Sequence, residues 1–128
     1  MKNLTIKCLS VLVSLPISAL CYSNTVAPIC PDVSILKTST MSYSATKKPN
    51  EPVTVVTSLN KFGTQHYWSM SFLVSAGTLD GAINKARHSL SSLSFEYGPH
   101  YQQDRWICSY RADELGVLKV SAETKSNQ

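Results

Sequence analysis

The placement of the four cysteines is the feature that most constrains how this chain of 128 residues can fold. Cys8 and Cys21 bound an uncharged, mostly apolar run near the N-terminus, whereas Cys30 and Cys108 lie in the rest of the chain. If a targeting segment carrying the first pair is removed, the other two cysteines have a single possible connectivity. A Cys30–Cys108 disulfide would hold the start of the mature chain against a segment near its end.

Residues 1–23 have the pattern of a secretory signal peptide. Two lysines precede the apolar run and small residues follow it: Lys2, Lys7, Ser18, Ala19 and Ser23. A basic start, an apolar centre and small residues before the cleavage site are typical of export signals. The apolar run of about 14 residues is shorter than the roughly 20 that a membrane-spanning helix needs, so no transmembrane segment is expected after cleavage.

Two cleavage sites fit this pattern, one after Cys21 and one after Ser23. A lipid anchor on Cys21 is an alternative, although Leu20 stands where bacterial lipoprotein signals carry a small residue. Either cleavage also removes two lysines and lowers the formal net charge from +4 to +2. A balance so close to neutrality argues against a nucleic-acid partner, because proteins that bind nucleic acids concentrate basic charge.

Export to the periplasm or the extracellular medium favours disulfide formation, because these compartments are oxidising. In the chain-entropy picture, a crosslink that closes a loop of about 80 residues stabilises the fold by about 4–5 kcal/mol. The alternative is a pair of unpaired buried thiols. A redox enzyme is not indicated, because the chain contains no C-x-x-C spacing.

Alternating apolar and polar residues predict four strands in the mature domain, which is expected to span residues 24–122. These strands are expected at 53–59, 67–75, 105–111 and 117–122. A short helix is expected to begin at Cys30-Pro31-Asp32 and to end near Thr38. A longer amphipathic helix is expected from Thr78 to about Ser94. Residues 39–52 are expected to form a loop, with a brief strand near Met41–Ser44 as an alternative. Residues 95–104 are expected to form a second loop, and residues 123–128 a flexible C-terminal tail.

The order α-β-β-α-β-β predicts an α+β fold: one four-stranded antiparallel sheet with the helices on one face and one disulfide. The expected core consists of the apolar strand positions and the apolar stripe of the longer helix. These residues are Trp68, Met70, Phe72, Val74, Trp106, Cys108, Tyr110, Ile83, Ala86, Leu90 and Leu93.

Two surfaces are candidates for binding. The first is the aromatic loop, in which Tyr97, His100 and Tyr101 adjoin glutamines, a combination that suits sugar stacking or protein contact. The second is the polar face of the sheet, which carries Tyr67, Arg105 and Arg111 together with other residues. For each surface there is an alternative without a binding role. The aromatic loop could simply fold its side chains onto the core, and the polar face of the sheet could be an ordinary solvated surface.

No catalytic residue is assigned, and no cofactor or metal is expected. The three histidines have no metal-ligand spacing, and the mature chain would keep no free cysteine as a ligand. Among carboxylates, Glu96 and Asp104 flank the aromatic loop and could approach one another, which leaves a small hydrolase as a weaker hypothesis.

The segments ICPDVSILK (29–37) and WICSY (106–110), together with the signal pattern, resemble small exported bacterial proteins. The similarity is to domain-of-unknown-function families from gammaproteobacteria, including Legionella-type intracellular pathogens. Such families have no assigned activity. The resemblance therefore implies export and two cysteines, and it transfers no catalytic residue.

The function expected from these features is that of a small exported, non-catalytic module that binds a protein or an envelope component. A structural subunit of an envelope or secretion assembly is the main alternative. The partner's identity and the oligomeric state do not follow from the residues.

Overall fold

The computed structural model describes residues 6–7, 22–23 and 26–125. Most of the expected signal peptide, with Cys8 and Cys21, lies outside the described residues, as do residues 126–128 of the expected tail. In chain order the elements are β1 (Ile6–Lys7), β2 (Tyr22–Ser23), α1 (Val33–Thr38), β3 (Tyr43–Lys47), β4 (Val53–Thr57), β5 (Ser69–Val74), α2 (Leu79–Ser89), the 3-10 turn η1 (Leu90–Ser92), β6 (Ser94–Gln102), β7 (Arg105–Arg111) and β8 (Val117–Lys125).

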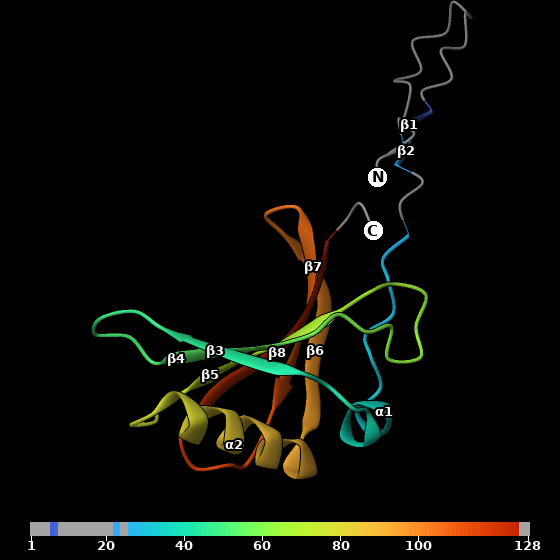
Figure 1. Cartoon of the computed structure of the whole chain (residues 1–128). Coiled ribbons are helices and arrows are strands. Elements are labelled where there is room, and N and C mark those ends of the chain that lie inside the picture. Colours follow the sequence, from blue (N-terminus) through green and yellow to red (C-terminus); the bar gives the residue numbers. More distant parts are fainter. Residues whose placement is uncertain (1–5, 8–21, 24–25, 126–128) are drawn as a thin grey trace, which may run out of the picture.

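Six antiparallel strands form one sheet in the order β3-β4-β5-β8-β7-β6, and β1 pairs separately with β2. Each helix leads into three consecutive strands, α1 into β3, β4 and β5, and α2 into β6, β7 and β8. The two three-stranded units meet where β5 pairs with β8 at the centre of the sheet. The sheet is strongly twisted, so that β6 and β7 run across the direction of β3 and β4 (Figure 1).

The predicted α+β fold with a four-stranded sheet, in the order α-β-β-α-β-β, is wrong. The protein is mostly β, and from α1 onwards its helices and strands follow the order α-β-β-β-α-β-β-β. The four predicted strands are present, but each of the two units begins with a further strand, β3 or β6. Strand β8 also continues to Lys125, so the first three residues of the expected tail belong to the sheet.

The two further strands are the two edges of the sheet. The brief strand considered near Met41–Ser44 overlaps β3, whereas β6 occupies the segment expected to be a loop. An edge strand has one neighbour and need not carry a strong apolar alternation, because one side of its backbone faces water. Strand β3 consists of Tyr-Ser-Ala-Thr-Lys and contains no fully buried residue. Strand β6 contains Gly98-Pro99, which normally indicates a turn, but proline is tolerated at a sheet edge because its missing N–H removes no ladder bond.

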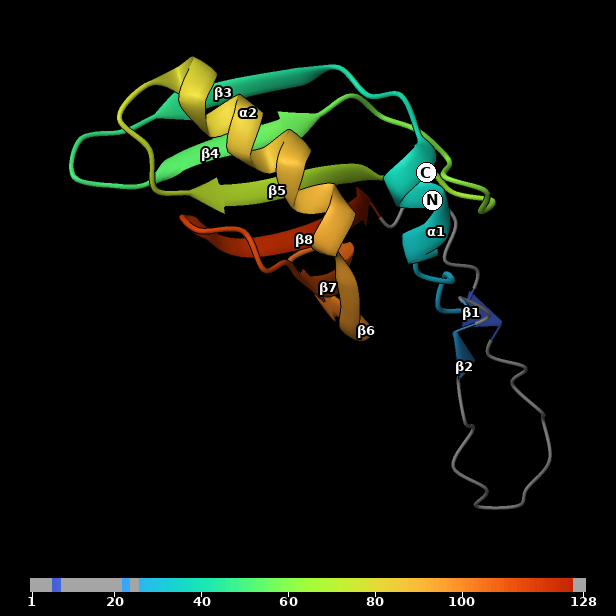
Figure 2. The same ribbon diagram turned by 90° about the horizontal axis from the view of Figure 1, so that it is seen from below.

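Helix α2 lies across one face of the sheet, over β3, β4, β5 and β8 (Figure 2). Thr78 caps its N-terminus by accepting a hydrogen bond from the Gly81 N–H at 2.9 Å. Likewise Asp32 caps α1 by accepting from the Ser34 N–H at 2.8 Å. Both helix starts are therefore confirmed, and α1 ends at Thr38 as expected. The longer helix ends at Ser89 and continues as η1.

The core lies between α2 and the sheet, and most of the predicted core residues are buried there. Ile83 and Trp106 are only partly buried but pack against this core. Phe62 lies in a turn between β4 and β5 and is also part of the core, with 1% of its surface exposed. Its backbone has φ = 46°, a left-handed conformation that is uncommon for a bulky residue.

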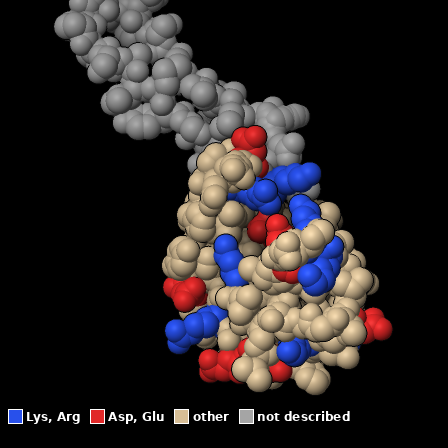
Figure 3. All heavy atoms as spheres, turned by 90° about the vertical axis from the view of Figure 1, so that its left-hand side faces the viewer, with Lys and Arg blue, Asp and Glu red and all other residues tan. Residues whose placement is uncertain are grey.

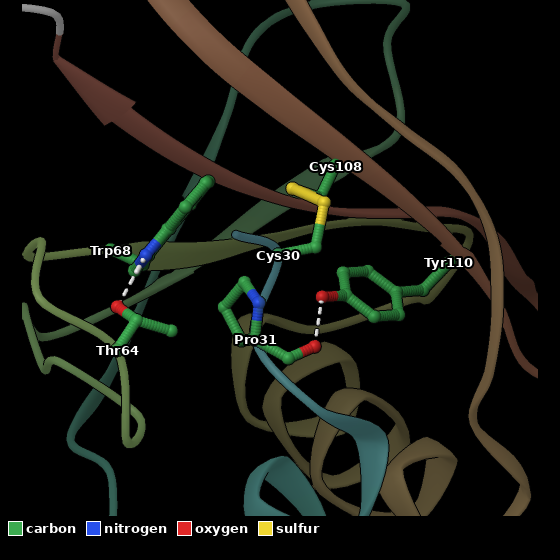
Figure 4. Close-up of a disulfide and its surroundings, with 6 residues drawn as sticks. All are labelled: Cys30, Pro31, Thr64, Trp68, Cys108 and Tyr110. Carbon is green, nitrogen blue, oxygen red and sulfur yellow. Dashed lines mark hydrogen bonds between the residues drawn. A yellow bond between two sulfur atoms is a disulfide. The ribbon is translucent and has the colours of Figure 1, made fainter. Parts of the chain in front are cut away.

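The predicted disulfide is confirmed. Cys30 is bonded to Cys108 on β7, with the two Cα atoms 5.8 Å apart and 78 positions apart in the sequence (Figure 4). Tyr110, two residues along the same strand, donates a hydrogen bond to the carbonyl oxygen of Pro31. Two consecutive residues of the N-terminal segment are therefore held against the core side of β7.

Candidate functional site

The face of the sheet opposite α2 carries the largest group of predicted binding residues. We call this surface the open sheet face. Most of its members lie in three rows across the strands: Leu73, Lys119 and Arg111; Ser71, Ser121, Ser109 and Tyr97; and Ser69, Glu123, Ile107 and His100. Arg105 lies beyond the third row, opposite Lys125. Because side chains alternate along a strand, these residues all point away from the core.

A groove of about 180 Å³ lies at one end of the open sheet face, between β6, β7 and β8. Its wall includes Glu96, Tyr97 and Leu118 and the two cations Arg111 and Lys119. Tyr97 is 56% exposed and Leu118 59% exposed. Among the described residues, neither cation forms an ion pair. The groove therefore presents an aromatic surface beside two cations, with the carboxylate of Glu96 in the same wall.

Tyr97 and His100 form a stacked pair on this face, with ring centroids 5.6 Å apart and planes inclined by 16°. The stack exists because β6 is bulged twice, between Phe95 and Tyr97 and between Tyr97 and His100. Each bulge adds a residue and changes which side chains share a face. The Nδ1 atom of His100 is buried and has no hydrogen-bond partner among the described residues.

At the other end of the open sheet face, Arg105 and Glu123 form a hydrogen-bonded ion pair. Ser121 donates a further hydrogen bond of 3.4 Å to the other carboxylate oxygen of Glu123. Arg105 is paired, unlike Arg111, and so contributes less free positive charge. On the face shown in Figure 3, basic and acidic side chains are interspersed among uncharged residues.

The structure brings together four of the six predicted binding residues, Tyr97, His100, Arg105 and Arg111, all on the open sheet face. Tyr101 is placed differently, because it points to the core side of β6, where its ring meets Trp106 with centroids 5.2 Å apart. Tyr67 lies before β5, and its ring faces the ammonium of Lys61 at 5.2 Å. The predicted aromatic loop is thus a strand whose aromatic residues divide between two faces.

The weaker hydrolase hypothesis depended on Glu96 and Asp104 approaching one another, which the fold prevents. Glu96 lies near the start of β6 and Asp104 lies in the turn after it. Since a strand rises by about 3.3 Å per residue, they stand roughly 20 Å apart, farther than the 10 Å or less that separates paired carboxylates in glycosidases. Among the described residues, no cluster of three His, Cys, Asp or Glu could hold a metal ion.

Sequence reasoning missed the contribution of β8 to this site. Lys119, Ser121 and Glu123 alternate with Val120, Ala122 and Thr124, which point to the core side, although Ser121 is also buried, at 4% exposed. This period of two was visible in the sequence, but its extent was not, because residues from 123 onwards are polar and resemble a tail.

Within the described residues, no helix is long and apolar enough to cross a membrane.

No family model, curated protein or solved structure matches this chain. The resemblance to small exported proteins of unknown function therefore stays a prediction.

Proposed function

We propose that this protein is a small exported, non-catalytic module that binds a protein or an envelope component through its open sheet face. The observation that supports this proposal best is the groove beside Tyr97, where two cations, Arg111 and Lys119, adjoin an exposed aromatic ring. Neither cation forms an ion pair within the part of the chain that the structure describes, and Glu96 is the one carboxylate among the groove's lining residues. Exposed aromatic and arginine side chains are frequent anchors of interfaces. Unpaired cations suit a partner that carries anionic groups.

Export is part of the proposal. It is supported by the signal pattern of residues 1–23 and by the Cys30–Cys108 disulfide, because structural disulfides persist mainly in oxidising compartments. The test is the intact mass of the protein recovered from the envelope and medium of its producing cell. We expect a chain beginning at Tyr22 or Asn24, with two thiols that appear only after reduction. A full-length chain with four free thiols would contradict export.

The binding surface is tested by immobilising the wild-type protein and Arg111→Glu and exposing both to a solubilised envelope fraction. Lys61→Glu is the matched control, because it makes the same charge change in the loop between β4 and β5. We expect a component that wild type and Lys61→Glu retain and that Arg111→Glu loses. Equal retention by all three proteins would exclude the groove as the contact.

A complementary variant, Tyr97→Ala, removes the aromatic surface without changing charge. If Tyr97→Ala loses the same component as Arg111→Glu, the aromatic ring and the positive charge of the groove contact one and the same partner. Stoichiometric recovery of a large complex that neither substitution disturbs would instead favour a structural subunit.

A further inference from the structure

The two edges of the sheet differ in how they are protected. Strand β6 is interrupted by two bulges and contains Pro99, and such features prevent another strand from pairing with an edge. Strand β3 pairs with β4 over five consecutive residues without a register shift and contains no proline. It therefore presents a regular, unpaired backbone.

The register shows which backbone groups of β3 are free. Ser58 donates its N–H to the carbonyl oxygen of Ser42 at 2.9 Å. In an antiparallel pair, hydrogen-bonded and non-hydrogen-bonded positions alternate, so Ser44 and Thr46 also bond to β4. The N–H and C=O groups of Tyr43, Ala45 and Lys47 consequently point outward, and no described residue pairs with them.

A groove of about 580 Å³ adjoins the start of this edge, between the ends of α1 and α2. Its floor includes Met41, Tyr43 and the buried Leu90, and its rim carries the cations Lys37 and Arg87. Arg87 lies over the ring of Tyr43 at 4.9 Å, and none of the lining residues is acidic. The carboxylates on these elements are Asp32, which caps the opposite end of α1, Asp80, in the first turn of α2, and Glu51, in the turn after β3.

We propose that an extended peptide segment of a partner protein adds to the sheet along β3 and places a carboxylate side chain in this groove. Tyr43, Ala45 and Lys47 supply the main-chain hydrogen bonds, which give affinity in strand addition. Lys37 and Arg87 supply charge complementarity, and the apolar floor accepts the side chain's methylene groups. This inference concerns the opposite edge of the sheet and does not depend on the proposed role of the open sheet face.

The test uses the purified, disulfide-bonded protein and a fluorescently labelled peptide of alternating glutamate and valine. A peptide with lysine in place of glutamate is its matched control. With the glutamate peptide bound, we expect amide hydrogen exchange to slow by about tenfold or more at Tyr43, Ala45 and Lys47. Exchange at Ser44 and Thr46 should not change, because their N–H groups already bond to β4.

Two substitutions locate the site. Ala45→Pro removes an outward N–H at a position where an edge strand tolerates proline, and we expect it to abolish binding. Arg87→Glu keeps the strand intact and should weaken binding by about tenfold or more, whereas Lys61→Glu should not. Arg87→Glu keeps the test valid if Ala45→Pro does not fold.

Several outcomes would overturn the proposal. Absence of binding, equal binding of the lysine peptide, or a loss of binding caused by Arg111→Glu instead of Arg87→Glu would each do so. Slow exchange at Tyr43, Ala45 and Lys47 in the protein alone, together with a dimeric mass, would assign the edge to a second copy of the chain.

Discussion

Tyr110 links the N-terminal segment to the core through its hydroxyl group. It donates a hydrogen bond of 2.5 Å to the carbonyl oxygen of Pro31, next to the disulfide (Figure 4). Burial, and then the negative charge of Asp32, raise the pKa of Tyr110 above its usual value near 10. The fold thus keeps this phenol protonated at pH values where the unfolded chain loses the proton. The stability that Tyr110 contributes is fully present below about pH 10 and is lost as the pH rises further.

We predict that Tyr110→Phe lowers the free energy of unfolding by about 0.5–1.5 kcal/mol at pH 7, because the Pro31 carbonyl loses its partner. It should also reduce the decline of stability above pH 10. Urea unfolding between pH 7 and pH 11 measures both effects. Tyr101→Phe is the control, because Tyr101 is exposed and its hydroxyl bonds only to the nearby Asp104. If the stability of Tyr110→Phe declines above pH 10 as steeply as that of the wild type, ionisation of Tyr110 is not the cause of the decline.

Asp32 has the opposite pH dependence. Hydrogen bonds from the Ser34 hydroxyl and then the Ser34 backbone N–H lower the pKa of this exposed carboxyl. Its contribution to helix α1 is present above its unfolded pKa and is lost as the pH falls through its folded pKa.

The irregular pairing of β6 with β7 decides which face of the sheet each aromatic side chain of β6 occupies. Its two bulges place Tyr97 and His100 on the open sheet face and leave Phe95 and Tyr101 on the core side. Gly98, within the second bulge, has φ = 130°, and a Cβ atom there would lie 2.9 Å from the Ile107 carbonyl oxygen. The close approach of β6 to β7 therefore requires glycine at this position.

We predict that Gly98→Ala destabilises the protein by about 1–3 kcal/mol, because both the backbone angle and the neighbouring strand oppose a side chain. Thermal unfolding measures the effect. Gly77→Ala is the matched control, since a Cβ there meets nothing within 4 Å and should change stability by less than about 0.5 kcal/mol. Equal stability of the two variants would show that β6 does not pack as described.

For the whole molecule, the disulfide joins the segment before α1 to an inner strand of the second three-stranded unit. We predict that reduction, or the double substitution of Cys30 and Cys108 by serine, lowers the free energy of unfolding by up to about 4–5 kcal/mol. Urea unfolding of the oxidised protein and of the reduced, alkylated protein compares the two states. Coincident unfolding midpoints would mean that the crosslink contributes nothing to stability.

Local patterns in the sequence were sufficient to predict the inner strands, the helix starts and the pairing of Cys30 with Cys108. An inner strand or a helix that covers a core must carry an apolar period, and a lone cysteine pair has one connectivity. The edge strands β3 and β6 carry no such requirement, because backbone pairing with one neighbour holds them in place. Each edge strand forms a hairpin with the next strand along the chain, β3 with β4 and β6 with β7, and the bulges that bring Tyr97 beside His100 belong to the second hairpin. The sheet order depends on the pairing of β5 with β8, between residues distant in sequence. Such contacts leave no local period, so they became visible only in the folded chain.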